Sequence, residues 1–224
     1  MTKTLPADDT GTRADPPGER LVLQMWRTPV YQADCTGAAQ HLPALRELVL
    51  DADKNGAQSG AVNVIKSAPT MLTWKHPSID WLGHQISVAG RALARAVLGE
   101  AADEIDDHDI VTEAWAVICR PGRPLRPHTR HDSAWSGLLS IATDPDPHPD
   151  GDSDAGYLHM LDPRPAAVTR AASPGAVHYC PVPGRMIAFP GWQAHWMKAT
   201  TTRSRLRIAI AWNITYHQHG SWTP

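Results

Sequence analysis

The sequence predicts a mainly β fold, a sandwich or barrel with a few helices packed outside it. Twenty prolines and sixteen glycines interrupt the 224 residues, which favours many short strands over long helices. From about residue 110 the spacing of the apolar residues changes from helical to alternating. Short helices followed by six or more strands are typical of a β core with helices on its outside.

Two helices are expected before residue 100. Over residues 37–50, apolar residues recur at helical spacing and Thr36 can cap the first turn. The clearer helix covers residues 82–98 and ends at Gly99. Its apolar stripe consists of Leu82, Ile86, Ala89, Leu93 and Val97.

The strands are expected between Pro- and Gly-containing turns. A short first strand is predicted over Leu21–Trp26. The others are predicted over Val111–Cys119, Trp135–Ala142, Gly156–Leu161, Ala176–Cys180, Arg185–Phe189 and Leu206–Tyr216.

Length and charge restrict the classes of function. The polar, Pro-rich residues 1–20 are expected to form a disordered tail, and residues 21–224 a single domain. With 21 Lys and Arg against 23 Asp and Glu, the net charge of −2 argues against nucleic-acid or membrane partners held by bulk charge. Three cysteines without a CxxC pair, and no long apolar run, favour a cytoplasmic protein. A homodimer is compatible with the sequence.

The last predicted strand has two unlike faces. Leu206, Ile208, Ile210, Trp212 and Ile214 form a bulky face. The opposite face combines Arg207 and Asn213 with two alanines, which leaves volume unfilled. We interpret this face as the wall of a pocket in which Arg207 meets an anion. The alternative is a solvent-facing strand with one surface arginine.

Histidines are concentrated in a second region. Within residues 127–132 (PHTRHD) lie two histidines and an aspartate, and His195 follows about 65 residues later in FPGWQAHW. Imidazole and carboxylate groups from two strands could converge into the facial triad of a non-haem iron site. Any one of the twelve histidines, taken alone, is more simply explained as a packed or exposed side chain.

Several short patterns occur together and in order between Trp115 and Asn213. They are Trp115, Gly122, Pro127-His128, Ser136-Gly137, Gly156-Tyr157-Leu158, Asp162-Pro163-Arg164, Pro183-Gly184, Phe189-Pro190, Trp192, His195 and Arg207–Asn213. In order and spacing this stretch resembles the 2-oxoglutarate/Fe(II)-dependent oxygenases. The resemblance covers about 100 residues, and the helical N-terminal half fits the family loosely.

The resemblance implies a fold, cofactors and roles for residues. The fold would be a double-stranded β-helix, or jelly roll, using Fe(II), 2-oxoglutarate and O2 to hydroxylate a small molecule, as in natural-product biosynthesis. His128 and His195 would bind iron, and Arg207 would hold the remote carboxylate of 2-oxoglutarate. Trp115 and Ser136 are assigned to the cosubstrate pocket.

The sequence departs from the family at the second metal-ligand position, where Arg130 stands. A guanidinium has no lone pair to donate, so Arg130 cannot bind iron. We prefer a one-residue bulge that turns His131 or Asp132 inward as the third ligand. Otherwise iron has two protein ligands and an additional open position, which permits halide binding in related chemistry, or the site is inert.

Two other functions and two other ion motifs compete with this interpretation. A jelly-roll protein that binds a small molecule without turnover is favoured by Arg130, and a cupin-like metal enzyme would not need 2-oxoglutarate. His148-Pro149-Asp150 is the one literal HxD sequence, but it lies in an acidic loop after the expected ligand strand. Residues 51–56 resemble a calcium loop but lack the acidic twelfth residue, so a solvated turn explains them better.

Overall fold

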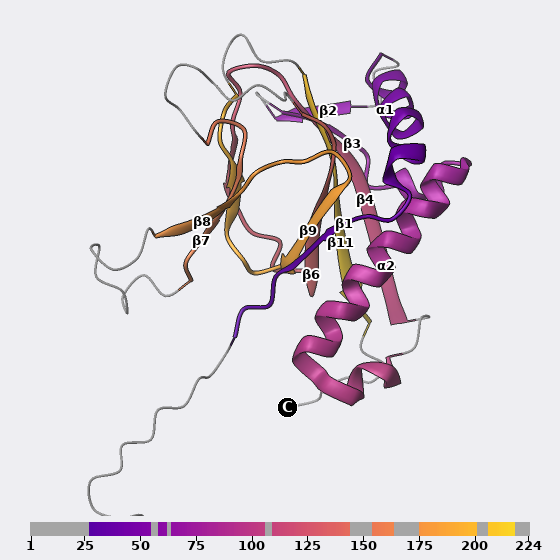
Figure 1. Cartoon of the computed structure of the whole chain (residues 1–224), viewed down its shortest axis with the longest axis vertical. Helices are drawn as coiled ribbons and strands as arrows, with labels where there is room; N and C mark the ends of the chain where they lie inside the picture. The colour runs from indigo at the N-terminus through magenta and orange to yellow at the C-terminus, as the bar shows by residue number, and fades with distance from the viewer. Residues whose placement is uncertain are drawn as a thin grey trace, which may run out of the picture.

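Two antiparallel β-sheets face each other, and helices cover the outer side of the larger sheet (Figure 1). The computed structural model describes residues 27–54, 58–61, 64–105, 109–143, 154–163, 175–200 and 206–217. The larger sheet has the order β1 (Tyr31–Asp34), β9 (Arg185–Pro190), β6 (Trp135–Ala142), β11 (Arg207–Tyr216), β4 (Ile110–Cys119), β3 (Val64–Ser67) and β2 (Gln58–Ala61). The smaller has the order β5 (Leu125–His128), β10 (His195–Met197), β7 (Leu158–Leu161) and β8 (Ala176–Tyr179). This is the mainly β jelly-roll arrangement that the sequence predicted.

The two longer helices lie side by side on the outer face of the larger sheet (Figure 1). They are α1 (Ala38–Lys54) and α2 (Pro77–Leu98), with short 3-10 segments η1 (Met71–Thr73) and η2 (Gly99–Glu104). Helix α2 begins where the His76 ring accepts a hydrogen bond from the Ser78 amide, and it ends at Gly99, whose φ is 62°. Its predicted apolar stripe is buried except for Val97 at the end.

Strand β11 separates two apolar cores. Its bulky face, from Ile208 to Ile214, packs with α1, α2 and the helix-facing side of the larger sheet. Its other face places Ala209 and Ala211 between the two sheets, among residues of both. The predicted two-faced strand is therefore confirmed, and its small-residue face points into the space between the sheets.

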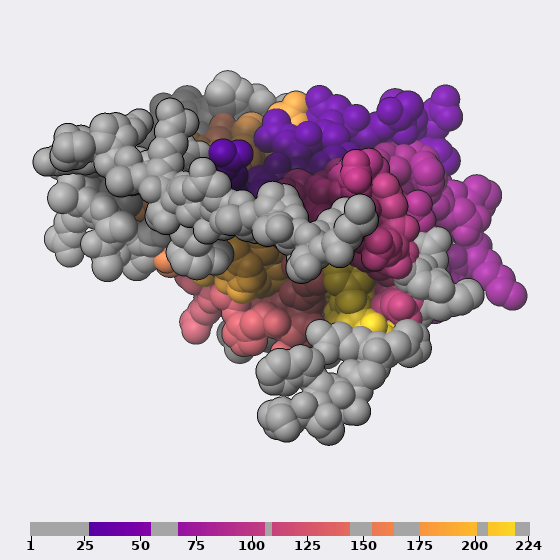
Figure 2. Space-filling view, turned by 90° about the horizontal axis from the view of Figure 1, so that it is seen from below, coloured from indigo at the N-terminus to yellow at the C-terminus, as the bar shows by residue number. Residues whose placement is uncertain are grey.

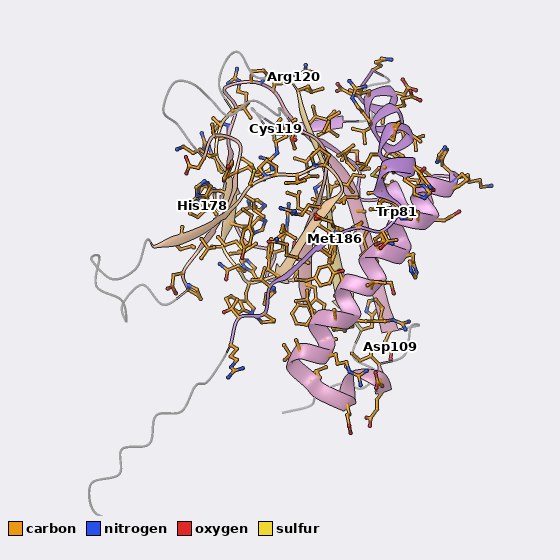
Figure 3. The ribbon with its side chains drawn as sticks, in the orientation of Figure 1. Trp81, Asp109, Cys119, Arg120, His178 and Met186 are labelled. Atoms are coloured by element: carbon orange, nitrogen blue, oxygen red, sulfur yellow. The ribbon has the colours of Figure 1, made fainter. Side chains whose placement is uncertain are left out.

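Strand β4 runs from the lower to the upper end of the β-sandwich as drawn in Figure 3. In Figure 3, Cys119 at the end of β4 lies near the top, and Asp109, just before β4, lies near the bottom. Because β11 runs antiparallel to β4, Arg207 pairs with Cys119. Arg207 therefore lies at the upper end of β11 in this view. In the same view, Trp81 lies on the helical side and His178 on the side of the smaller sheet.

Most predicted elements agree with the structure within a few residues. Strand β6 has the predicted bounds, whereas α2 begins five residues before the predicted helix because Pro77 can occupy its first turn. The unpredicted strands are β1, β2, β3, β5 and β10, and each is only three or four residues long. The expected tail over 1–20, the strand Leu21–Trp26 and His148-Pro149-Asp150 lie outside the described residues. Across the described residues, no helix combines the length and apolar character needed to cross a membrane.

Gly137 allows the largest buried side chain of the core to fit. It pairs with Trp212 across β6 and β11, and a Cβ on Gly137 would overlap the Trp212 indole. We expect Gly137→Ala to lower the free energy of unfolding by about 1–3 kcal/mol through overpacking. The measurement is urea-induced unfolding followed by tryptophan fluorescence.

Gly83 in α2 provides the control, because no atom lies within 4 Å of the position that a Cβ would take there. Gly83→Ala should leave stability unchanged or raise it by up to about 1 kcal/mol, since alanine favours helix. Equal unfolding midpoints for the two variants would contradict the packing argument.

Candidate functional site

Two histidines from distant parts of the chain lie opposite each other in the smaller sheet. His128 ends β5, His195 begins β10, and the two are cross-strand partners. Their ring centroids are 4.2 Å apart with an interplanar angle of 51°. Phe189 packs against the His195 ring with a centroid distance of 4.7 Å. The sheet thus brings together the two histidines that the sequence singled out.

Backbone carbonyls orient both imidazole rings in the same way. Nδ1 of His128 lies 2.9 Å from the carbonyl oxygen of Arg126, and Nδ1 of His195 lies 2.9 Å from that of Gln193. A carbonyl oxygen only accepts, so Nδ1 carries the proton in each ring. Nε2 then keeps its lone pair, which is the arrangement found in metal-binding histidines.

A small cavity of about 20 Å³ adjoins this pair. Its polar lining comes from His128, His195, Arg130 and Ser136, with Trp115 as one wall. The apolar lining consists of Val117, Leu125, Gly137, Leu138, Leu158, Phe189, Met197 and Ala211. The volume suits a single ion or water molecule rather than a drug-sized ligand.

A much larger cavity, of about 890 Å³, lies elsewhere, beside the C-terminal half of α2 and η2. Its charged lining residues are Arg91, Arg95 and Asp103, and the last two form an exposed ion pair. It contains no histidine from the described residues. We assign the site to the smaller cavity, because it holds the paired imidazoles.

Arg130 occupies the edge of the small cavity. Its guanidinium carbon lies 4.9 Å from the centroid of the Trp115 ring, within the range of a cation–π contact. The Arg130 side chain is partly buried, and this burial lowers the pKa of its guanidinium. No carboxylate of the described residues offsets that shift.

The segment after His128 leaves the sheet and turns. The Arg130 amide donates to the Gly191 carbonyl at 2.7 Å, and the Ser133 amide donates to the Arg130 carbonyl at 2.9 Å. Figure 2 shows coral-coloured residues from this part of the chain beside orange and yellow residues on the face seen from below. The turn is therefore fixed against the end of β9.

This turn keeps His131 and Asp132 away from the histidine pair. Both are exposed, neither lines the cavity, and Nδ1 of His131 is 2.7 Å from the Thr129 hydroxyl. The inward bulge expected from the sequence is not present, because the chain turns rather than continuing as a bulged strand. Among the described residues, no three His, Cys, Asp or Glu side chains form a metal-binding group.

Arg207 is buried between the sheets. Only 3% of its surface is exposed, and none of its three guanidinium nitrogens has a hydrogen-bond partner among the described residues. Burial lowers its pKa to about 10, and the groups that oppose this shift are the thiols of Cys119 and Cys180. A buried cation without a carboxylate partner is costly unless a ligand supplies one.

Thr200 adds a second unpartnered group near Arg207. Its buried hydroxyl also lacks a hydrogen-bond partner among the described residues. A Cβ on Gly156 would lie 3.0 Å from Cγ2 of Thr200 and 3.7 Å from Nη1 of Arg207, so both side chains border the same glycine. No pattern in the sequence indicated Thr200, which follows β10 in an irregular segment.

The two remaining predicted pocket residues both line the small cavity. Ser136 is buried, and its hydroxyl donates to Oδ1 of Asn213 at 2.7 Å. Trp115 is 6% exposed, and its indole N–H has no hydrogen-bond partner among the described residues.

The comparisons with known proteins agree with this geometry. Residues 113–213, a little under half of the chain, match the family model described as "Putative 2OG-Fe(II) oxygenase". This stretch is similar to the 2-oxoglutarate/Fe(II) oxygenases. The family to which this stretch is similar uses Fe(II) as its metal and 2-oxoglutarate as its cosubstrate. No match was found among curated protein sequences.

Solved structures of oxygenases share the fold at low sequence identity. A prolyl-4-hydroxylase from Pseudomonas putida has a TM-score of 0.59 at 15% identity, over 84% of this chain and 93% of that one. The carbocyclase SnoK from nogalamycin biosynthesis has a TM-score of 0.55 at 11% identity, over 85% and 82%. HygX from Streptomyces hygroscopicus, with nickel and 2-oxoglutarate bound, has a TM-score of 0.53 at 10% identity, over 88% and 85%.

The residues present fit this metal and cosubstrate, with one departure. Two imidazoles with Nδ1 tied to carbonyl oxygens suit a ferrous ion. A buried guanidinium with unpartnered nitrogens suits the distal carboxylate of 2-oxoglutarate. The departure is that, among the described residues, no third side chain joins the two histidines as a metal ligand.

Gly191 offers a test of how the turn is positioned. A Cβ there would overlap the carbonyl oxygens of Arg130 and Ser133. We expect Gly191→Ala to lower the free energy of unfolding by about 1–3 kcal/mol. It should also weaken the Arg130–Trp115 contact, which near-UV circular dichroism of the tryptophan can detect. An unchanged spectrum together with unchanged stability would contradict the close packing of this turn.

The buried charge of Arg207 predicts an effect on stability. Replacing it by the similarly sized, neutral methionine should raise the free energy of unfolding of the ligand-free protein by about 1–3 kcal/mol. The pKa of Arg207 in the folded state lies below its ordinary value, so the penalty is complete at neutral pH and is relieved only above pH 10. Urea unfolding at pH 7 measures the change.

Arg207→Lys is the matched control, because it keeps a buried cation at the same position. It should not show the gain in stability. Loss of stability in Arg207→Met would contradict the absence of an internal partner for this guanidinium.

Proposed function

We propose that this protein is an Fe(II)/2-oxoglutarate oxygenase that hydroxylates a small molecule, with iron held by Nε2 of His128 and His195. In this proposal Arg207, with the hydroxyl of Thr200, binds the distal carboxylate of 2-oxoglutarate. The observation that carries the proposal is a buried guanidinium without an internal partner, on the same face of β11 as Ala211, which lines the cavity of the paired histidines. Ala209 and Ala211 are the small residues on this face of β11, and Ala211 lines the cavity together with both histidines.

The chain's own residues would bind, orient and exclude water. The carbonyls of Arg126 and Gln193 keep both imidazoles in the tautomer that presents Nε2. The apolar side chains around the cavity exclude bulk water from this region. When bound, iron and 2-oxoglutarate supply the oxidising chemistry of the family, in which 2-oxoglutarate is converted to succinate and CO2.

A small-molecule substrate is supported by two structural neighbours. Among the neighbours, SnoK comes from nogalamycin biosynthesis, and HygX has been solved with hygromycin B bound. We therefore propose a natural-product intermediate as the substrate class.

The test of this function is the charge-transfer absorption of an anaerobic Fe(II)–2-oxoglutarate complex. Wild-type protein should develop a visible band, and admission of O2 should yield succinate. His128→Ala and His195→Ala should each abolish the band and reduce bound iron at least tenfold, because each removes one of only two imidazole ligands.

His131→Ala and Asp132→Ala are the matched controls, because both side chains are exposed and lie away from the cavity. They should retain the wild-type iron stoichiometry. Full iron binding by His128→Ala would contradict the proposed ligand set, and absence of a band in wild type would instead favour a binding protein without turnover.

A further inference from the structure

Arg130 changes the charge around the proposed metal site. It lies two residues after His128 and lines the same cavity as both histidines. Two neutral imidazoles contribute no negative charge to a ferrous ion, and Arg130 adds a positive charge at the cavity edge. Fe(II), Arg130 and Arg207 together carry about four positive charges. The two negative charges of 2-oxoglutarate leave a net charge of about +2. A site of this kind favours a further anion.

No group in the described surroundings of Arg130 supplies that anion. Glu113, on the strand that carries Trp115, is exposed, as is Asp132 in the turn that follows Arg130. Among the described residues, no carboxylate forms an ion pair with the Arg130 guanidinium. Trp115, whose ring lies against this guanidinium, carries an indole N–H that is buried without a hydrogen-bond partner. The Arg130 guanidinium and the Trp115 indole N–H are therefore two hydrogen-bond donors beside the cavity to which a bound anion would accept hydrogen bonds.

We propose that Arg130 binds a carboxylate group of the substrate beside the histidine pair, so that the substrate supplies the negative charge that the protein lacks there. This inference rests on the function proposed above and names its substrate class: a carboxylic acid. The Trp115 ring contacts the Arg130 guanidinium, and the turn anchored to Gly191 positions the Arg130 backbone. Arg130 is thus a specificity-determining residue.

The geometry of the donor favours a carboxylate over a halide. A guanidinium presents parallel N–H groups that match the two oxygens of a carboxylate, whereas a halide uses only a point contact. A halide is therefore the competing outcome of the test.

The experiment titrates acetate, as a minimal carboxylate, into the anaerobic protein loaded with Fe(II) and saturating 2-oxoglutarate. At constant ionic strength, acetate should shift the charge-transfer band of the wild type in a saturable way, and chloride should act at least tenfold more weakly. Arg130→Gln should raise the acetate concentration for half-saturation at least tenfold. Arg123→Gln is the matched control, because it removes an exposed arginine from the turn before β5 and should behave as wild type.

Arg130→Asp provides a gain-of-function arm. Aspartate at this position supplies a carboxylate from the protein, so iron affinity should rise at least tenfold and the response to acetate should disappear. No saturable response to acetate in a wild type that shows the band would overturn the proposal. Chloride as effective as acetate, or displacement of 2-oxoglutarate by acetate, would overturn it as well.

A metal-free readout separates this proposal from the function itself. Saturation-transfer NMR is done in the Arg207→Met background, which removes the other proposed carboxylate site. It should detect acetate bound to metal-free Arg207→Met and not to the metal-free double variant Arg207→Met/Arg130→Gln. If that difference is seen while no charge-transfer band forms, the oxygenase function fails and the carboxylate site stands. If the band forms and the NMR difference is absent, the carboxylate site fails alone.

Discussion

The fold places a positive charge between two sheets without an internal partner among the described residues. A guanidinium as buried as that of Arg207 costs several kcal/mol unless a counter-charge is provided. The described residues provide thiols but no carboxylate, and burial accordingly lowers the pKa of this group to about 10. The ligand-free protein therefore holds an anion site at the expense of stability, as is common where binding depends on a preorganised charge.

The alternation of side chains along β11 makes this arrangement compatible with a well-packed protein. The bulky face packs with the helices, while the opposite face carries the arginine and two alanines toward the smaller sheet. A single strand thus supplies both core packing and one wall of the site. The smaller sheet completes the site, because the β5–β10 register sets His128 opposite His195. Arg207 comes from the larger sheet and the two histidines come from the smaller one. The apolar core between the sheets fixes their positions relative to each other.

The sequence predicted the elements that show a long alternating pattern, and it did not predict positions that depend on contacts with distant residues. Alternation in β6 and β11 was long enough to locate both strands, and the mixed face of β11 by itself indicated a buried Arg207. The paired histidines followed from a resemblance covering several short patterns. The positions of His131 and Asp132 could not be predicted, because they depend on a turn anchored by Gly191 some 60 residues later. Thr200 gave no signal, since its importance arises only from its neighbours in space.

The central claim is that Arg207 is an anion site for the distal carboxylate of the cosubstrate. The most direct test compares two ligands that differ only in this group, 2-oxoglutarate and 2-oxopentanoate, by anaerobic calorimetric titration of the iron-loaded wild type and Arg207→Met. Charge-assisted hydrogen bonds to a buried guanidinium should make 2-oxoglutarate bind at least a hundredfold more tightly to the wild type. Arg207→Met should bind both equally and weakly. Equal affinities of the wild type for the two ligands would contradict the account.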